Sequence, residues 1–318
     1  MFDIIQVTEL RETSTVLMKF ILGDDLIFKR IVAFLMSVIT CIANLLGINT
    51  VKMNNVIYED YAYGTHERHT LDLYIPKYAD EVGLVLFIHG GAWIGGDKDG
   101  YESTLEKFAG KGDYAYAAIN YRYISDDVDL NDLMDDVQLA VDCIKKLGEE
   151  NGVNINKMLL TGGSAGAHMS MLYAYSRDEV SAITPVAVVS DCGPTDLTEE
   201  KYFFDNAIGD KDAIAQILSW ACGQKITYET RLEATDAIKK VSPLYYVDEN
   251  TVPTIINHGQ RDDVVPFDNA VALDAKLTEC GVEHIFNVFP NSDHGLSSDP
   301  DVRKTSDEQM LEYMKKYL

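Results

Sequence analysis

Residues 157–168 read KMLLTGGSAGAH, and this stretch decides the fold. The apolar residues at 157–161 predict a buried strand, and a helical pattern opens at Ala165 directly afterwards. Between the two lies a G-x-S-x-G motif, Gly162 to Gly166. Glycine is needed on both sides of the serine because the corner is too tight for side chains, and the turn presents the hydroxyl above the sheet. The motif alone also fits a plain glycine turn, so the flanking strand and helix carry the prediction that Ser164 is a nucleophile.

Short apolar strands and amphipathic helices alternate from residue 56 onward. The continuous apolar run at 83–89 predicts a central strand buried on both faces, and the first two strands are expected to pair antiparallel. This alternation predicts an α/β fold with a mostly parallel central sheet flanked by helices. Strands are expected at 56–62, 69–75, 83–89, 114–121, 157–161, 185–190, 253–258 and 283–289, and helices at 101–109, 131–150, from 165, 267–280 and 302–317. The helix at 131–150 is expected to turn inward Leu133, Val137, Leu139, Ala140, Val141, Ile144 and Leu147.

The segment at 197–247 interrupts this alternation. It holds two helical candidates, 211–222 and 229–240, and no strand pattern. An insertion at this point lies above the carboxyl ends of the strands, where α/β sheets bind ligands. We therefore expect a small helical cap insertion that shapes the substrate pocket.

The first 50 residues follow neither pattern. Residues 31–48 carry no charge, and their length meets the lower limit for a transmembrane helix. Residues 3–22 place charges between apolar positions, as a surface helix does, and such a helix needs an apolar partner. The preferred interpretation is a helical N-terminal lid, 1–50, over a catalytic domain at 51–318. The alternative is a membrane anchor through residues 31–48, which would make the protein membrane-anchored rather than cytoplasmic.

Charge and cysteine usage limit the classes of partner. The chain has 51 acidic and 27 basic residues and a net charge of -24, which repels phosphate backbones, so no nucleic acid partner is expected. The five cysteines have neither metal-ligand spacing nor the pattern of a disulfide framework, which favours a reducing compartment and a cytoplasmic location. They are interpreted as small core residues: Cys41, Cys143, Cys192, Cys222 and Cys280. No metal site is expected, and no feature indicates an oligomeric state.

A second glycine motif, His89-Gly90-Gly91-Ala92-Trp93, follows the buried strand at 83–89. Acyl transfer passes through a tetrahedral oxyanion that needs hydrogen-bond donors fixed in advance, and a glycine loop exposes its backbone N–H groups. The donors of this oxyanion hole are assigned to Gly91 and Ala92, together with Ala165 after the nucleophile. His89 is expected to brace the loop. Trp93 is assigned to substrate binding, with a core role as the alternative.

The acid and the base of a catalytic triad follow the serine along the chain in this type of fold. Asp262 and Asp263 both lie in the loop after the strand at 253–258, and the spacing favours Asp262. His294 lies in a loop after the last strand and before the last helix, where a general base is expected. The other histidines are in less suitable positions and are interpreted as structural: His66, His69, His89, His168, His258 and His284. Ser164, Asp262 and His294 are therefore the predicted triad.

Four motifs in this order resemble the hormone-sensitive-lipase-like esterases, and most closely the bacterial feruloyl/acetyl-xylan esterase-like hydrolases. They are HGGAW (89–93), GGSAGAH (162–168), HGQRDDVVPF (258–267) and SDHG (292–295), and the likeness covers roughly residues 56–318. The resemblance implies an α/β-hydrolase fold and hydrolysis of esters of small acyl groups, without metal or organic cofactor. Gly163 departs from the lipase-like branch, which has Asp before the nucleophile, and this weakens the transfer of that branch's substrate preference.

The leading hypothesis is a serine carboxylesterase that acts on short-chain acyl esters through an acyl-enzyme intermediate. Its partner is a small-molecule ester, and an acylated carbohydrate that carries acetyl or aromatic acyl groups is one candidate. An amide hydrolase, such as an arylformamidase or a small peptidase, is the first alternative, because such enzymes share both glycine motifs. A non-catalytic binding relative is the second alternative, and the intact set of candidate residues argues against it.

Overall fold

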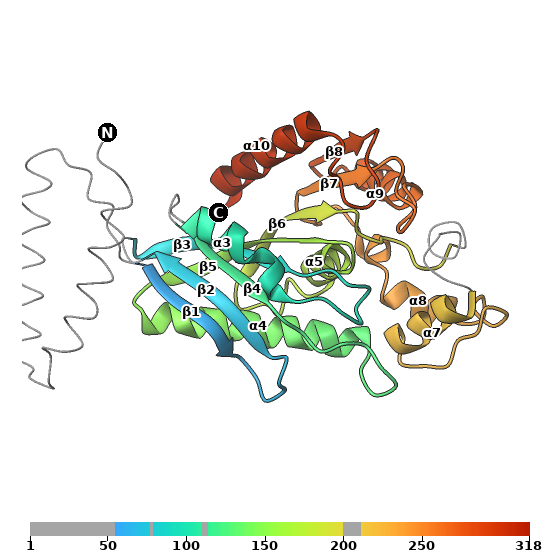
Figure 1. Ribbon diagram of the computed structural model, residues 1–318, viewed down its shortest axis with the longest axis horizontal. Coiled ribbons are helices and arrows are strands. Elements are labelled where there is room, and N and C mark those ends of the chain that lie inside the picture. The colour runs from blue at the N-terminus through green and yellow to red at the C-terminus, as the bar shows by residue number, and fades with distance from the viewer. Residues whose placement is uncertain (1–54, 77–78, 110–113, 200–210) are drawn as a thin grey trace, which may run out of the picture. The chain divides into compact units, whose positions relative to one another are not determined.

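The computed structural model describes residues 55–76, 79–109, 114–199 and 211–318 (Figure 1). The chain divides into two compact units, Met1–Met53 and Asn54–Leu318, and the described residues belong to the second. Both interpretations of residues 1–50, the lid and the anchor, concern a segment outside the described residues. Within the described part of the chain, no helix has the length and apolar character needed to cross a membrane.

Eight strands of the described residues form one sheet, in the order β1-β2-β4-β3-β5-β6-β7-β8. β1 pairs antiparallel with β2 and β2 antiparallel with β4, and all the other pairings are parallel. The predicted antiparallel opening pair and mostly parallel sheet are therefore confirmed. The strands are β1 Asn55–Ala62, β2 Thr70–Pro76, β3 Glu81–Ile88, β4 Ala115–Ile119, β5 Asn154–Gly163, β6 Thr184–Asp191, β7 Thr254–Gly259 and β8 His284–Phe289.

Helices cover both faces of this sheet (Figure 1). They are α3 Glu102–Ala109, α4 Leu130–Glu150, α5 Ala165–Ser176, α7 Lys211–Ala221, α8 Thr235–Lys240, α9 Asp268–Cys280 and α10 Pro300–Tyr317, with short 3-10 turns η1 Lys98–Tyr101 and η2 Pro243–Tyr246. Successive side chains of a strand point to opposite faces. Leu84, Leu86 and Ile88 of β3 accordingly join the core that contains α4, α5 and α9, while Val85 and Phe87 join the one that contains α3 and α10. These contacts confirm the α/β-hydrolase fold.

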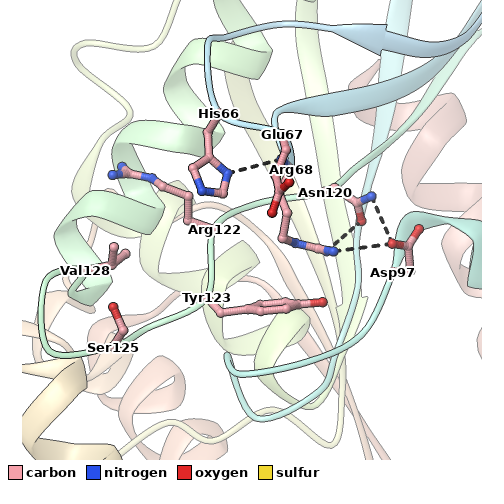
Figure 2. A pocket seen from close by; sticks show the side chains of 9 residues that line it. All are labelled: His66, Glu67, Arg68, Asp97, Asn120, Arg122, Tyr123, Ser125 and Val128. Carbon is pink, nitrogen blue, oxygen red and sulfur yellow. Dashed lines mark hydrogen bonds and ion pairs between the residues drawn. The ribbon is translucent and has the colours of Figure 1, made fainter.

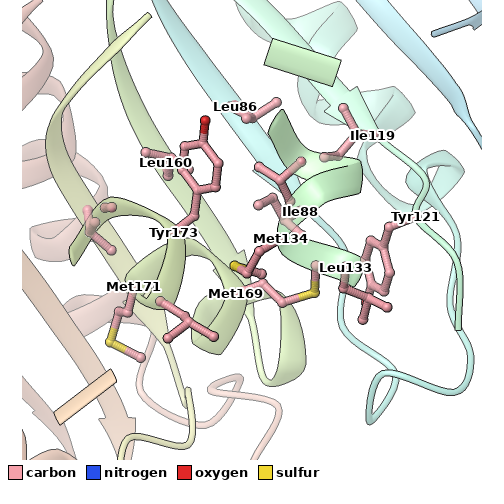
Figure 3. Packing of buried hydrophobic residues seen from close by; sticks show 14 of the residues in the cluster. Leu86, Ile88, Ile119, Tyr121, Leu133, Met134, Leu160, Met169, Met171 and Tyr173 are labelled. Carbon is pink, nitrogen blue, oxygen red and sulfur yellow. The ribbon is translucent and has the colours of Figure 1, made fainter. Parts of the chain in front are cut away.

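Helix α5, which follows Ser164, is packed inside the larger core (Figure 3). Met169 and Tyr173 lie among residues of the sheet and of α4, and nearly every side chain of α5 is buried. The predicted inward face of α4 is correct except at Leu139, which is 44% exposed. Leu139 lies two residues beyond buried Val137, a rotation of about 200° around the helix, which points it away from the sheet.

The predicted cap insertion is only partly described, because residues 200–210 lie outside the described ranges. Helix α7 matches its prediction, but the second expected helix, at 229–240, is helical only from Thr235. The hydroxyl groups of Thr227 and Thr230 accept hydrogen bonds from each other's backbone N–H at 3.3 and 3.0 Å, respectively. Such local bonds compete with a helix, and they account for the turns before α8.

Candidate active site

Ser164 stands at the corner between β5 and α5 with φ 56° and ψ -124°, a conformation that is strained for a residue with a side chain. Its N–H donates to the carbonyl of Asp191 at 2.8 Å, which ties the corner to the end of β6. A Cβ at Gly162 or at Gly166 would collide with the carbonyl oxygen of Ile88. The two glycines of the motif are therefore required by the close approach of β3, as the sequence predicted.

Gly163 differs from its two neighbouring glycines. A Cβ added there would meet only the carbonyl oxygen of Asp191, at 3.9 Å, which is an ordinary contact. The position before Ser164 consequently has room for a side chain. This room explains in physical terms why a fold of this type can carry Asp or Gly there.

The glycine motif after β3 forms a tight turn beside Ser164. Gly91, Ala92 and Trp93 have φ angles of 120°, 52° and 61°, which keep the backbone in the left-handed region. A Cβ on Gly90 would lie 3.4 Å from that of Ser164, so the loop and the serine are immediate neighbours. The N–H of Ala165 is the first of α5 and has no acceptor within the helix. The predicted oxyanion donors Gly91, Ala92 and Ala165 thus belong to segments that flank Ser164.

His89 holds this loop in place. Its Nδ1 donates to the carbonyl of Gly90 at 2.8 Å, and its ring stacks on Tyr121 with centroids 4.2 Å apart. The Tyr121 hydroxyl donates in turn to the His89 carbonyl at 2.7 Å. Burial, together with the charge of Arg68, lowers the pKa of His89 to about 4, so the ring is neutral at pH 7. These contacts are those of a brace rather than of a reacting group.

Arg68 holds the same loop and was not singled out by the sequence. Its guanidinium donates to the carbonyls of Tyr121 and Gly96 at 2.8 and 3.1 Å, and to Asn120 Oδ1 at 3.0 Å. Its Nη2 also lies 3.2 Å from Nε2 of His89, which accepts from it. Figure 2 shows Arg68 over the ring of Tyr123, 4.1 Å from its centroid, in a pocket that none of the predicted triad residues lines. Arg68 is thus a structural support of the predicted oxyanion loop.

The structure brings Asp262, rather than Asp263, to His294. Asp262 Oδ2 lies 2.8 Å from His294 Nδ1, while Asp263 is exposed. The other carboxylate oxygen of Asp262 accepts from the backbone N–H groups of Val264 and Val265 at 2.9 and 2.8 Å. Because an ionised carboxylate only accepts hydrogen bonds, His294 carries its proton on Nδ1 and leaves Nε2 free to accept another. This is the tautomer that a general base requires.

The carboxylate of Asp262 stays ionised although its side chain is fully buried. Burial alone would raise its pKa, but hydrogen bonds from His258, His294 and the N–H of Val265 outweigh burial and hold the pKa well below its ordinary value. Nε2 of His258 lies 2.9 Å from the Val265 carbonyl and 3.3 Å from Asp262 Oδ2. His258 therefore orders the acid loop, as expected.

Cys192 completes the surroundings of Asp262. It follows the end of β6, is 1% exposed and has φ 51°. Burial raises the pKa of its thiol above the ordinary range, and the negative charge of Asp262, to which it hydrogen bonds, raises it further. The sequence described Cys192 only as a core residue and gave no sign of this contact.

The loop that carries His294 is fixed by Asp299, a second residue that sequence reasoning missed. The Asp299 carboxylate accepts from the N–H of Asn291 at 2.9 Å and from the hydroxyl of Ser292 at 2.7 Å. It lies just before α10 and is buried. Its partners stand two and three residues before His294, so it fixes the position of His294 through the backbone.

Trp93 is 3% exposed and belongs to the main core. Its indole meets the imidazole of His168 edge-on, with centroids 5.0 Å apart, and its carbonyl accepts from the N–H of Ile124 at 3.0 Å. Burial supports the core role that the sequence left open, while contact with substrate stays a prediction. Ile94, the next residue, is 45% exposed on the same loop and is a better placed candidate for such a contact.

Sequence comparison relates the chain to known hydrolases. Residues 71–277 match the BD-FAE family, and residues 237–318 match the Dienelactone hydrolase family. A probable carboxylic ester hydrolase of Mycobacterium tuberculosis, LipM, is 29% identical over 232 residues, which are 67% of this chain and 51% of LipM. The chain thus spans about half the length of this curated relative.

Solved structures share the fold at low sequence identity. A truncated carbohydrate esterase from gut microbiota superposes with a TM-score of 0.67 at 20% identity, over 83% of this chain and 98% of that one. Esterase B of Lactobacillus rhamnosis superposes with a TM-score of 0.64 at 19% identity, over 91% of this chain and 95% of that one. At such identities the superpositions bear on the fold alone.

Proposed function

Because the chain belongs to the BD-FAE family, pairs Asp262 with His294 and holds Ser164 at a strained corner between β5 and α5, we propose that it is a serine carboxylesterase. Ser164 is the nucleophile, His294 the general base and Asp262 the acid that orients the base. The observation that carries the proposal is the 2.8 Å contact between Asp262 Oδ2 and His294 Nδ1, which leaves Nε2 of His294 free to take a proton.

In the acylation step, the hydroxyl oxygen of Ser164 attacks the ester carbonyl while His294 Nε2 takes the hydroxyl proton. The tetrahedral oxyanion accepts hydrogen bonds from the backbone N–H groups of Gly91, Ala92 and Ala165. Collapse of this intermediate expels the alcohol, which receives the proton from His294. The ionised carboxylate of Asp262 stabilises the imidazolium while it exists.

Deacylation repeats the chemistry with water. His294 Nε2 removes a proton from a water molecule that attacks the acyl-serine, and the same backbone donors hold the second oxyanion. When the intermediate collapses, Ser164 recovers its proton and the carboxylic acid leaves. None of these steps requires a group beyond the residues of this chain and water.

The alcohol part of the substrate is proposed to be a carbohydrate. Helix α7 and the loop after β4 enclose a cavity of about 480 Å³ in which Trp220 stands among Asp126, Asp212 and Gln216. Trp220 Nε1 donates to Asp126 at 2.8 Å, two residues after Ile124, whose N–H bonds to the predicted oxyanion loop. A flat indole beside several polar side chains suits a polyhydroxylated ring.

Covalent labelling tests the nucleophile. A fluorophosphonate probe is expected to label the purified protein, and Ser164→Ala is expected to lose both labelling and hydrolysis of p-nitrophenyl acetate. Ser170→Ala is a matched control, because Ser170 is a buried serine of α5, about one and two-thirds turns beyond Ser164, whose hydroxyl donates to the helix backbone. Labelling that survives in Ser164→Ala would contradict the assignment. Hydrolysis of N-formylkynurenine in preference to esters would favour an amide hydrolase.

Cysteine pairing bears on the location of the protein. Cys143, Cys192, Cys222 and Cys280, the cysteines within the described residues, are all unpaired. This supports a reducing compartment, and we propose the cytoplasm.

A further inference from the structure

A third coordinating group lies beside the Asp262–His294 pair. One ligand atom from each of Cys192, Asp262 and His294 lies within 4.8 Å of the other two, and no other three His, Cys, Asp or Glu side chains of the described residues are so arranged. The Cys192 and Asp262 side chains are buried, whereas that of His294 is 24% exposed. The cluster therefore has a buried floor and one side that solvent can reach.

We propose that Cys192, Asp262 and His294 form an inhibitory site for a soft or borderline divalent cation, of which Zn²⁺ is the representative. Thiolate sulfur, imidazole nitrogen and carboxylate oxygen are the ligands of protein-bound zinc, at about 2.3, 2.0 and 2.1 Å. Tetrahedral bonds of these lengths put the ligand atoms about 3.3–3.6 Å apart. Since the three ligand atoms lie within 4.8 Å of one another, shifts of about 1 Å would bring them to that geometry, with a water molecule in the fourth position.

The donor set distinguishes this cluster from the acidic residues that are abundant on a chain of net charge -24. Carboxylates alone favour Ca²⁺ or Mg²⁺, whereas a sulfur ligand selects softer ions. When the cation binds, the Cys192 thiol releases its proton to water and the sulfur becomes a thiolate ligand. Cys192 thus determines which ion the site takes.

The position of the cation explains why binding would inhibit. The proton on His294 Nδ1 bonds to Asp262 Oδ2 at 2.8 Å, and the cation displaces it from Nδ1, so that it moves to Nε2 of the same ring. A neutral imidazole bound to metal through Nδ1 carries its single proton on Nε2, so it cannot accept the proton of Ser164. Inhibition therefore rests on the proposed function, whereas binding of the cation does not.

Equilibrium dialysis of the full-length protein against Zn²⁺ tests the site directly. The Cys192→Ala variant is expected to bind Zn²⁺ at this site at least about tenfold more weakly than the unmodified protein. Cys222→Ala is the matched control, since Cys222 is also a poorly exposed thiol near one carboxylate, Asp129, but is not part of such a cluster. Cd²⁺ gives a second readout, because its bond to a thiolate produces an ultraviolet charge-transfer band that Cys192→Ala should lack and Cys222→Ala should retain.

Equal Zn²⁺ binding by Cys192→Ala and the unmodified protein, or a Cd²⁺ band that persists in Cys192→Ala, would overturn the proposal. If the alanine variant does not fold, Cys192→Ser serves instead, because it preserves the shape but replaces sulfur with a hydroxyl that zinc binds poorly. Hydrolysis of p-nitrophenyl acetate is measured in parallel. A protein that binds Zn²⁺ through Cys192 but hydrolyses no ester refutes the proposed function and keeps the metal site. The opposite pair of results refutes only the metal site.

Discussion

Replacing Asp262 by asparagine changes one atom in the predicted triad and reverses a hydrogen bond. The oxygen Oδ1 accepts from two backbone N–H groups, those of Val264 and Val265, so the carbonyl oxygen of an asparagine is held at that position. Its NH₂ group then occupies the place of Oδ2, 2.8 Å from Nδ1 of His294. Two donors cannot face each other at that distance, so His294 moves its proton to Nε2 and exposes a lone pair on Nδ1.

The loss of activity follows from the tautomer. With a proton on Nε2, His294 cannot accept the proton of Ser164, and the imidazolium also loses the stabilising carboxylate. A change of this kind lowers kcat by about 10⁴, or about 5 kcal/mol of transition-state stabilisation, in enzymes with the same arrangement of groups. We expect Asp262→Asn to lose about that much in kcat with p-nitrophenyl acetate and to keep its fold, because both backbone hydrogen bonds survive.

Asp263→Asn is the control for this experiment. Its carboxylate is exposed and lies in the same loop, one residue further along, so the substitution should change kcat less than about twofold. Steady-state kinetics near pH 8 with circular dichroism of both variants would measure the difference. If Asp263→Asn were the more damaged variant, or if Asp262→Asn kept more than about one per cent of the activity, the inference from this hydrogen-bond pattern would be wrong.

Three further predictions concern the elbow, a buried histidine and the acyl pocket. Gly162→Ala should unfold or inactivate the protein, because its Cβ collides with the Ile88 carbonyl. Gly163→Ala should change the free energy of unfolding by less than about 1 kcal/mol, and thermal denaturation of the two variants would measure this difference in stability. Burial lowers the pKa of His168 from 6.5 to about 4. As the pH falls, this histidine therefore takes up a proton at a higher pH in the unfolded chain than in the folded protein. The free energy of unfolding consequently decreases from pH 6.5 towards pH 4. His168→Gln has no titrating group at this position. In urea titrations, its free energy of unfolding should therefore decrease by about 2 kcal/mol less between pH 7 and pH 5 than that of the unmodified protein. Activity on p-nitrophenyl esters from acetate to dodecanoate should fall beyond about six carbons, since a methylene contributes about 0.8 kcal/mol only where it is buried; a maximum at octanoate or longer would contradict this.

The sequence predicted the sheet and the corner at Ser164 because both depend on local patterns. Residues 84–88 are apolar throughout, since β3 is covered on both faces, and the two glycines of the elbow are required within five residues of chain. The prediction was less accurate where side chains compete with the backbone. The helix expected at 229–240 begins only at Thr235, because the threonines before it bond to each other's backbone groups. A helical pattern does not reveal such competition.

The residues that support the candidate site could not be predicted, because their contacts depend on how the chain folds and not on a local sequence pattern. Arg68 leaves the turn between β1 and β2 and reaches the carbonyls of Gly96 and Tyr121, and Asp299 fixes the loop of His294 from the start of α10. Cys192 meets Asp262 only because β6 and β7 are neighbours in the sheet. Charged and sulfur-containing residues at such places look like surface or core residues in the sequence. Their roles arise from the strand order, which brings the ends of β5, β6 and β7 together and leaves every polar group there in need of a hydrogen bond.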